Sequence, residues 1–376
     1  MYEPTGHPNF AFLWPAMAAA SASEMAATFA KQFTNLAVGT FQSVAPPPRW
    51  TTPNNIALKL KTVQLRDFTA GKIGIPTLLC APLALHGAMV ADLAPDHSLV
   101  AALQRAGLSR IFITDWRSAT AEMRHLGIDD YLADLNVLVD DIGPPIDLIG
   151  LCQGGWMSLI YAARFPNKIR KLVLVASPID TAAAPSALSE LANATPLAMF
   201  RELVRFGDGL VPGQKVLKFW APQSVEADDI RKLLQFDEAT DPSAFAQLEA
   251  AFRDWYAWTL DLPGAFFLET VEKLYKRNEL AGGNFTALGR KIDLSALKKP
   301  LFLLAAQDDE LVAPAQLLAA AHLMGTEPCN RREMTVPGRH LGMFMGRRIL
   351  ENEWPEIVNW LNEALPSAVP TQIAAE

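Results

Sequence analysis

Long apolar runs are missing from this chain of 376 residues, although half of its residues are hydrophobic. No stretch approaches the roughly 18 consecutive apolar residues of a membrane-spanning helix. Dense runs of lysine and arginine are also missing, and the formal net charge is −7, so a nucleic-acid-binding face is not expected. The amino terminus, MYEPTGHPNF, has no cationic stretch and carries an acidic residue at position 3, which argues against a secretory signal.

Cysteine is equally scarce, with Cys80, Cys152 and Cys329 far apart in the chain. An odd, dispersed set argues against a disulfide framework and favours a reducing compartment. The spacing also lacks the pattern of a zinc site. These features predict a cytoplasmic protein without a metal or a resident cofactor.

The first 55 residues differ in composition from the rest. Residues 11–42 are rich in alanine and methionine, with apolar positions at helical spacing, and VAPPPRWTTPNN (44–55) is rich in proline. We therefore expect a helical region and linker over residues 1–55 and a catalytic domain over 56–376. The apolar helices could bind a granule surface or a second subunit, or pack on their own domain.

Short apolar runs of strand length recur after residue 56. They are KLKTVQLRDF (59–68), IPTLLCAP (75–82), RIFITD (110–115), PIDLIG (145–150), KLVLVAS (171–177), PLFLLAA (300–306) and REMTVP (332–337). Helix-like segments separate several of them, at 96–107, 129–142 and 152–165. This alternation predicts an α/β fold with a mostly parallel sheet and helices on both faces.

One interval has no clear core strand, from residue 178 to residue 299. A structureless loop of that length would be exceptional in a compact domain. The interval is rich in helix formers and aromatic residues, so we expect an inserted helical cap at about 180–298. The aromatic side chains either pack within this cap or line a channel for an apolar substrate.

The sequence Gly150-Leu151-Cys152-Gln153-Gly154 follows a predicted strand and begins a predicted helix. Alone, it is also compatible with a buried structural cysteine. In this context it matches the nucleophile elbow of α/β-hydrolases, where a tight turn projects the nucleophile above the sheet and leaves room only for glycine on either side. The helix N-terminus favours a thiolate, and the backbone N–H of Gln153 is placed to donate to an oxyanion.

A catalytic acid and a histidine follow the nucleophile in this fold. QDDELVAP follows the 300–306 strand, and the spacing to Leu311 and Val312 favours Asp309 over the neighbouring Asp308. His340 lies in GRHLGMF, beyond the last predicted strand. We therefore predict that His340 takes the thiol proton, that Asp309 orients it, and that Cys152 forms an acyl-thioester. The second oxyanion donor is expected near Leu83 or Ala84.

The motif GLCQGG resembles the lipase-like box of polyhydroxyalkanoate synthases. The similarity extends to APLALHGAMVADLAPDHSLVAALQRAG with IFITDWRSAT, and to KIDLSALKKPLFLLAAQDDELVAP. The C-terminal GRHLGMFMGRRILENEWPEIVNWL is more similar to the intracellular polyhydroxyalkanoate depolymerases, which also have a cysteine nucleophile followed by glutamine. The resemblance covers roughly residues 60–365 and implies that Cys152 is the nucleophile, Asp309 the acid and His340 the base.

Three departures place this chain between those activities. Glu310 stands where the synthases have a histidine, and LLQFDEATDPSAFAQL does not match the expected synthase cap segment. Conversely, the depolymerases have Cys-Gln-Pro where this chain has Cys-Gln-Gly-Gly. We therefore rank hydrolysis of intracellular polyhydroxyalkanoate or its oligomers first and polymer synthesis from 3-hydroxyacyl-coenzyme A second. The alternatives are another cysteine hydrolase or thioesterase, and a granule-binding protein without turnover. Coenzyme A could be substrate or acceptor, and a homodimer is left open.

Overall fold

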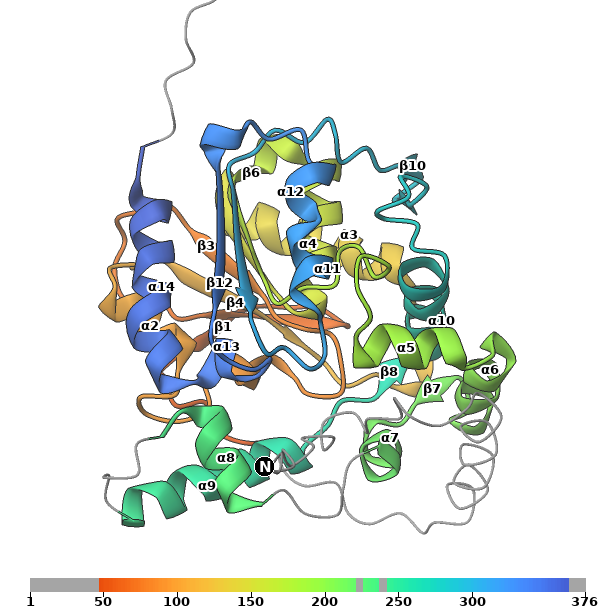
Figure 1. The fold of residues 1–376 in the computed structure, drawn as a ribbon, viewed down its shortest axis with the longest axis horizontal. Coiled ribbons are helices and arrows are strands. Elements are labelled where there is room, and N and C mark those ends of the chain that lie inside the picture. Colours follow the sequence, from red (N-terminus) through yellow and green to blue (C-terminus); the bar gives the residue numbers. More distant parts are fainter. Residues whose placement is uncertain (1–46, 221–225, 237–241, 365–376) are drawn as a thin grey trace, which may run out of the picture.

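The computed structural model describes residues 47–220, 226–236 and 242–364 (Figure 1). The helices expected within residues 11–42 lie outside these residues. The described chain is built on one eight-stranded sheet, with strands in the order β1-β2-β4-β3-β5-β6-β11-β12. The strands are β1 (Asn55–Lys59), β2 (Val63–Asp67), β3 (Thr77–Cys80), β4 (Ile111–Trp116), β5 (Ile146–Leu151), β6 (Ile169–Val175), β11 (Leu301–Ala306) and β12 (Arg331–Val336).

The sheet is parallel from β4 to β12, as the alternation of strands and helices predicts. Strands β3, β5 and β11 are buried along their whole length, which explains their continuous apolar sequences. Only β2 runs antiparallel to its two neighbours. Because parallel strands end at the same edge, the loops after β3, β5, β11 and β12 meet there.

The strand expected over residues 59–68 corresponds to the shorter β2. A further strand, β1, precedes it and was not predicted, and the two are joined by a turn in which the Leu60 N–H donates to the Val63 carbonyl. The mostly exposed β1 forms the edge of the sheet and carries little apolar periodicity that a sequence pattern could detect.

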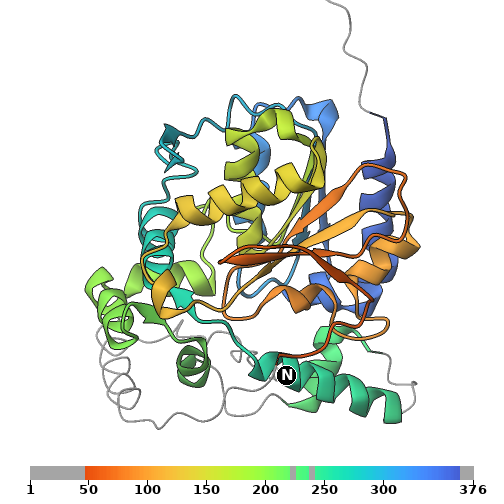
Figure 2. The same ribbon diagram turned by 180° about the vertical axis from the view of Figure 1, so that it is seen from behind.

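Helices cover both faces of the sheet (Figures 1 and 2). Helices α2 (Leu99–Arg105) and α14 (Arg347–Asn362) pack together on one face. Helices α3 (Ile128–Ile142) and α4 (Gln153–Arg164) lie on the other, close to the ranges predicted from the sequence. Shorter helices complete the two layers and the loops: η1 (Ala88–Ala91), η2 (Ala121–Met123), η3 (Pro166–Lys168), α11 (Pro314–Leu318), α12 (Ala320–Leu323), η5 (Pro328–Asn330) and α13 (Gly342–Met345).

The chain between β6 and β11 is helical in its first part (Figure 1). It forms α5 (Ala187–Ala194), α6 (Leu197–Phe206), α7 (Gly213–Trp220), α8 (Ala227–Leu234), α9 (Pro242–Ala257), α10 (Gly264–Glu269) and the π-helix η4 (Thr270–Lys276), with the short pair β7 (Leu210–Val211) and β8 (Leu262–Pro263). These elements, which we call the cap, lie beyond one end of the sheet. After η4 the chain leaves the cap through the hairpin β9 (Thr286–Ala287) and β10 (Arg290–Lys291), where the Leu288 N–H donates to Asp129 of α3.

The described part of the predicted linker is bound to the domain. The Thr52 N–H and hydroxyl both donate to the buried carboxylate of Asp92, at 2.8 and 2.7 Å. The Trp50 ring packs against Phe68 and beneath the guanidinium of Arg66. Residues 50–52 therefore belong structurally to the domain that follows them. No helix among the described residues has the length and apolar character needed to cross a bilayer.

Candidate active site

Cys152 lies at the turn between β5 and α4, as the elbow motif predicts. Its backbone has φ 49° and ψ −118°, a conformation that L-residues rarely adopt outside functional sites. Two hydrogen bonds brace the turn: the Cys152 N–H donates to the Val175 carbonyl, and the Gly155 N–H donates to the Cys152 carbonyl. The strain is thus held by the surrounding sheet and helix, and the thiol is directed toward the carboxyl edge.

Close packing explains the glycines of the elbow. A Cβ on Gly154 would lie 2.0 Å from the Cys80 carbonyl oxygen, and one on Gly150 would lie 2.5 Å from the Cα of Gly155. Gly155 is under the same constraint, because its Cβ would lie 1.8 Å from the Ser177 hydroxyl. The sequence GLCQGG therefore allows α4 to begin directly against the ends of β3 and β6.

Replacing Gly154 with alanine should lower the free energy of unfolding by about 3 kcal/mol, because the clashing atom belongs to the backbone of β3 and cannot rotate away. Urea denaturation of the variant and the parent protein would measure the loss. Gly71→Ala is the matched control, since its Cβ would meet Ser109 at an ordinary 3.4 Å, and its effect should stay within about 0.5 kcal/mol. Equal unfolding midpoints for the two variants would contradict this explanation of the motif.

His340 and Asp309 meet beyond the ends of β12 and β11. The His340 Nδ1 lies 2.8 Å from Asp309 Oδ2 and 3.0 Å from Oδ1, and both side chains are buried. The backbone N–H groups of Leu311 and Val312 donate to the same Oδ1, at 2.9 and 2.8 Å. The residue pattern that favoured Asp309 therefore has a physical basis, because those two N–H groups hold its carboxylate. The side chain of Asp308 is exposed.

The thiol of Cys152 contacts the same imidazole. Burial lowers the pKa of His340, but the charges and hydrogen bonds of Asp309 and Cys152 outweigh burial, and the pKa lies well above its ordinary value. The site therefore holds His340 as a stronger base than a free imidazole, between the Asp309 carboxylate and the Cys152 sulfur. The structure brings together all three residues that the sequence selected, and it places them at the carboxyl edge of the sheet.

Glu310, which follows Asp309, contacts the backbone of His340. Its carboxyl group accepts a hydrogen bond from the His340 backbone N–H, at 3.3 Å. Burial, and then the charge of Asp309, raise the pKa of Glu310. It therefore retains its proton to a higher pH than an exposed glutamate.

The predicted oxyanion residues gather around the elbow. Leu83 and Ala84, on the loop after β3, line the same cavity as Gln153. Among the described residues, no group accepts a hydrogen bond from the backbone N–H of these three residues. The three N–H groups are thus available as donors, which is the requirement for an oxyanion hole. No cluster of three or more potential metal ligands occurs in the described part of the chain.

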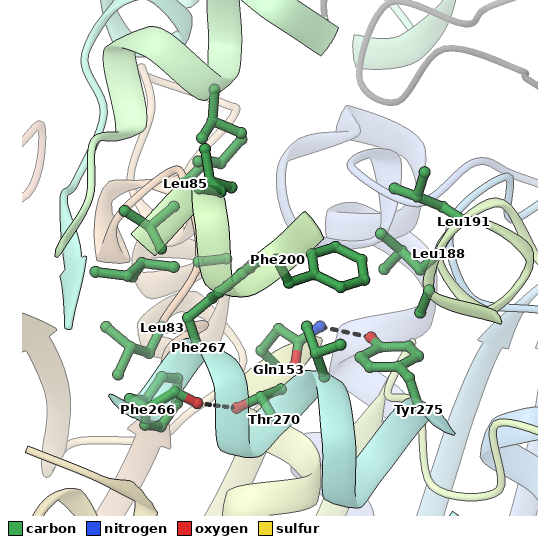
Figure 3. Close-up of a pocket in the computed structure, with 17 residues that line it drawn as sticks. Leu83, Leu85, Gln153, Leu188, Leu191, Phe200, Phe266, Phe267, Thr270 and Tyr275 are labelled. Carbon is green, nitrogen blue, oxygen red and sulfur yellow. Dashed lines mark hydrogen bonds between the residues drawn. The ribbon is translucent and has the colours of Figure 1, made fainter. Parts of the chain in front are cut away.

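Tyr275 is a further residue of the site that the sequence did not single out. It lies on η4 of the cap and accepts a hydrogen bond from Gln153 Nε2, at 2.8 Å (Figure 3). Burial, followed by the charge of Cys152, raises the pKa of Tyr275 far above its ordinary value, so the hydroxyl keeps its proton. A π-helix is a signal of functional sites, but it is visible only in the structure.

A family model described as the alpha/beta hydrolase fold matches residues 82–346. The chain belongs to the α/β-hydrolase family. Among its relatives, the poly(3-hydroxyalkanoate) polymerase subunit PhaC of Synechocystis sp. (strain ATCC 27184 / PCC 6803 / Kazusa) is 30% identical over 77% of this chain and 78% of that protein. The protein of the same name from Allochromatium vinosum is 25% identical over 77% of this chain and 83% of that protein.

A solved hydrolase structure from Pseudomonas aeruginosa PA01 is also similar, with a TM-score of 0.49 and 16% identity over 82% of this chain and 98% of that chain. The two polymerase relatives confirm the resemblance to the polyhydroxyalkanoate synthases that the sequence motifs indicated. The polymerase names of the relatives favour the function that the sequence placed second, and they reverse the ranking of hydrolysis over synthesis.

Proposed function

We propose that this α/β-hydrolase polymerises 3-hydroxyacyl groups taken from coenzyme A thioesters. Cys152 is the nucleophile, His340 the base, and Asp309 the group that orients His340. The observation that carries the proposal is the similarity to polymerases over 77% of the chain, at 30% identity. The buried contact of His340 with Asp309 and Cys152 supports the assigned roles.

The acylation step uses the charges at the edge of the sheet. His340 accepts the thiol proton of Cys152 as the sulfur attacks the thioester carbonyl, and the resulting oxyanion receives hydrogen bonds from the Gln153 N–H and from Leu83 or Ala84. Collapse of this intermediate breaks the carbon–sulfur bond to coenzyme A. His340 gives its proton to the departing thiolate. Because one thioester is exchanged for another, the step is nearly balanced in free energy.

The transfer step needs an incoming hydroxyl group. His340, now neutral, accepts the proton of the 3-hydroxyl group of a second acyl unit, whose oxygen attacks the Cys152 thioester. An ester bond forms and the thiolate is released. In hydrolysis a water molecule takes the place of that hydroxyl group, so the two functions differ only in the acceptor.

Polymerisation and hydrolysis predict opposite results in two assays. We expect 3-hydroxyacyl-coenzyme A of four or eight carbons to yield free coenzyme A together with insoluble polyester. Amorphous poly-3-hydroxybutyrate should release little acid under the same conditions. Cys152→Ala is the control for uncatalysed thioester loss. Acid release from the polymer, with free 3-hydroxy acid and no polyester in the first assay, would overturn the proposal and favour depolymerisation. Association with a granule surface and dimer formation remain predictions.

The Tyr275 hydroxyl should matter more for transfer than for acylation. Tyr275→Phe removes the acceptor of the Gln153 side chain and a protonated hydroxyl beside Cys152. We expect polymer growth to fall by about 10- to 100-fold, as for the loss of a positioned hydrogen-bonding group, with a smaller change in first-turnover release of coenzyme A. Rapid-quench measurements would separate the two steps.

Tyr161→Phe is the matched control for this prediction, since Tyr161 lies on α4 and its hydroxyl donates to Asn136 of α3. Its two rates should remain within about three-fold of the parent protein, as expected away from the site. Equal losses in both steps for Tyr275→Phe would show that its hydroxyl only supports the elbow.

A further inference from the structure

A cavity of about 120 Å³ lies between the elbow and the cap (Figure 3). Its floor includes Gln153, which follows the nucleophile, and Tyr275, whose hydroxyl contacts Gln153. The walls come from the cap and the loop after β3. Since Leu83 and Ala84 also line it, the cavity begins where the carbonyl of a bound acyl group would point its oxygen.

The lining excludes charged occupants. None of the described residues around the cavity carries a charge, and nearly all are aliphatic or aromatic. The phosphates of coenzyme A would lose their hydration there without gaining a cation. The occupant must therefore be an uncharged part of the substrate.

The few polar groups are already engaged with one another. Gln153 donates to Tyr275 and accepts from the Trp156 indole at 2.6 Å, and the Thr270 hydroxyl donates to the Phe266 carbonyl at 2.8 Å. A polyester chain would bring ester oxygens into this cavity with few donors to receive them. An alkyl group has no such requirement, so the lining fits a hydrocarbon tail better than the growing polymer.

The volume limits the length of that tail. An apolar protein cavity of about 150 Å³ accommodates benzene, with six carbons, so by proportion this one accommodates about five. The alkyl group on C3 is a methyl in 3-hydroxybutyrate and a pentyl, with five carbons, in 3-hydroxyoctanoate. The cavity is therefore nearly filled by the second and largely empty with the first.

We propose that this cavity binds the C3 alkyl group of medium-chain 3-hydroxyacyl thioesters, with about six to eight carbons in the acyl chain. The inference rests on the proposed acylation of Cys152 and adds the substrate class. Cap helices α5, α6 and α10 supply much of the lining, through residues such as Ala192, Phe200 and Phe267. Chain length is thus selected by the cap, while the chemistry is performed by the loops of the sheet.

Comparing thioesters on the parent protein tests the proposal directly. Each methylene group that enters an apolar cavity should raise kcat/KM by about four-fold. The four methylene groups that separate octanoyl from butyryl should therefore raise it by up to roughly 200-fold. We expect kcat/KM for first-turnover coenzyme A release to be about 50- to 200-fold higher with 3-hydroxyoctanoyl- than with 3-hydroxybutyryl-coenzyme A. Equal or reversed values would overturn the inference and leave the acylation chemistry standing. No Cys152-dependent release with either thioester would overturn both proposals.

Two variants alter the volume in opposite directions. Ala192→Leu adds three carbons to the cavity wall and should reduce the octanoyl-to-butyryl ratio of kcat/KM by about 10-fold or more. Ala194→Leu, on the same helix but outside the cavity lining, is its control and should keep the parent ratio. Phe267→Ala enlarges the cavity and should raise the rate with 3-hydroxydodecanoyl- relative to 3-hydroxyoctanoyl-coenzyme A. Unchanged ratios in both cavity variants would show that the alkyl group binds elsewhere.

Discussion

Replacing Cys152 with alanine should reduce acyl transfer by about 10⁴-fold or more, the scale of nucleophile removal in enzymes with a catalytic triad. No other thiol can take its place. Cys152 occupies the strained turn above the sheet and contacts His340, so it alone combines an attacking sulfur with a base. First-turnover release of coenzyme A from 3-hydroxyoctanoyl-coenzyme A measures the loss, and circular dichroism would show that the fold is retained.

The other two cysteines provide the controls. Burial raises the pKa of Cys80 to about 12, which keeps this thiol protonated and unreactive within β3. Cys329 is exposed on η5, away from the elbow. Cys80→Ala and Cys329→Ser should each retain activity within a few-fold of the parent protein, as for other sites outside the mechanism. Substantial activity in Cys152→Ala would end the nucleophile assignment.

Most strands of the parallel sheet were predictable because they are buried on both faces, although β12, at the edge of the sheet, is largely exposed. Six apolar runs of four to eight residues correspond to β3, β4, β5, β6, β11 and β12, and each is bounded by turn residues or a helix. The elbow was predictable for a similar reason. Its glycines are required because a Cβ there would clash with neighbouring residues of the elbow or with adjacent strands, and this requirement produces a fixed spacing of glycines in the sequence.

The cap was predictable as helical but not in its packing. Its helices α6 and α8 are amphipathic, more strongly than α4 below the elbow, but the apolar face of a helix does not say which other element it packs against. Tyr275 is separated from Gln153 by 122 residues, and only the folded chain brings the two side chains together. The aromatic residues of the cap divide between both expected roles. Phe200 and Phe267 line the cavity, whereas Phe252 and Trp255 pack in the core.

The ranking of hydrolysis over synthesis depended in part on Glu310, which stands where the synthases have a histidine. The sequence shows the residue type but not its burial, and burial is the largest cause that raises the pKa of this carboxyl. The second reason was that LLQFDEATDPSAFAQL does not match the expected synthase cap segment. The cap nevertheless places the Tyr275 hydroxyl against Gln153, the residue that follows the nucleophile. Polymer synthesis is consequently compatible with the geometry of this site.

Replacing Asp309 with asparagine should reduce acyl transfer by about 10³- to 10⁴-fold, the scale seen when a triad acid loses its charge. The backbone of the loop determines the orientation of the asparagine side-chain amide. Because the N–H groups of Leu311 and Val312 both donate to Oδ1, the amide oxygen must stay there, and the NH₂ group must take the place of Oδ2 against His340. A donor facing Nδ1 favours the tautomer that carries its proton on Nε2. Such an imidazole cannot accept the proton of the thiol or of an incoming hydroxyl group.

Asp309→Asn also removes a negative charge beside His340. The Asp309 carboxylate raises the pKa of His340, so its neutralisation should lower that pKa and shift the corresponding limb of the pH–rate profile to lower pH. Asp308→Asn is the matched control, because the exposed Asp308 carboxylate lies outside the His340 contact and its loss should change the rate by no more than about three-fold. First-turnover rates from pH 5 to pH 9 would measure both effects. Comparable losses in the two variants, or an unshifted profile for Asp309→Asn, would show that a different carboxylate orients His340.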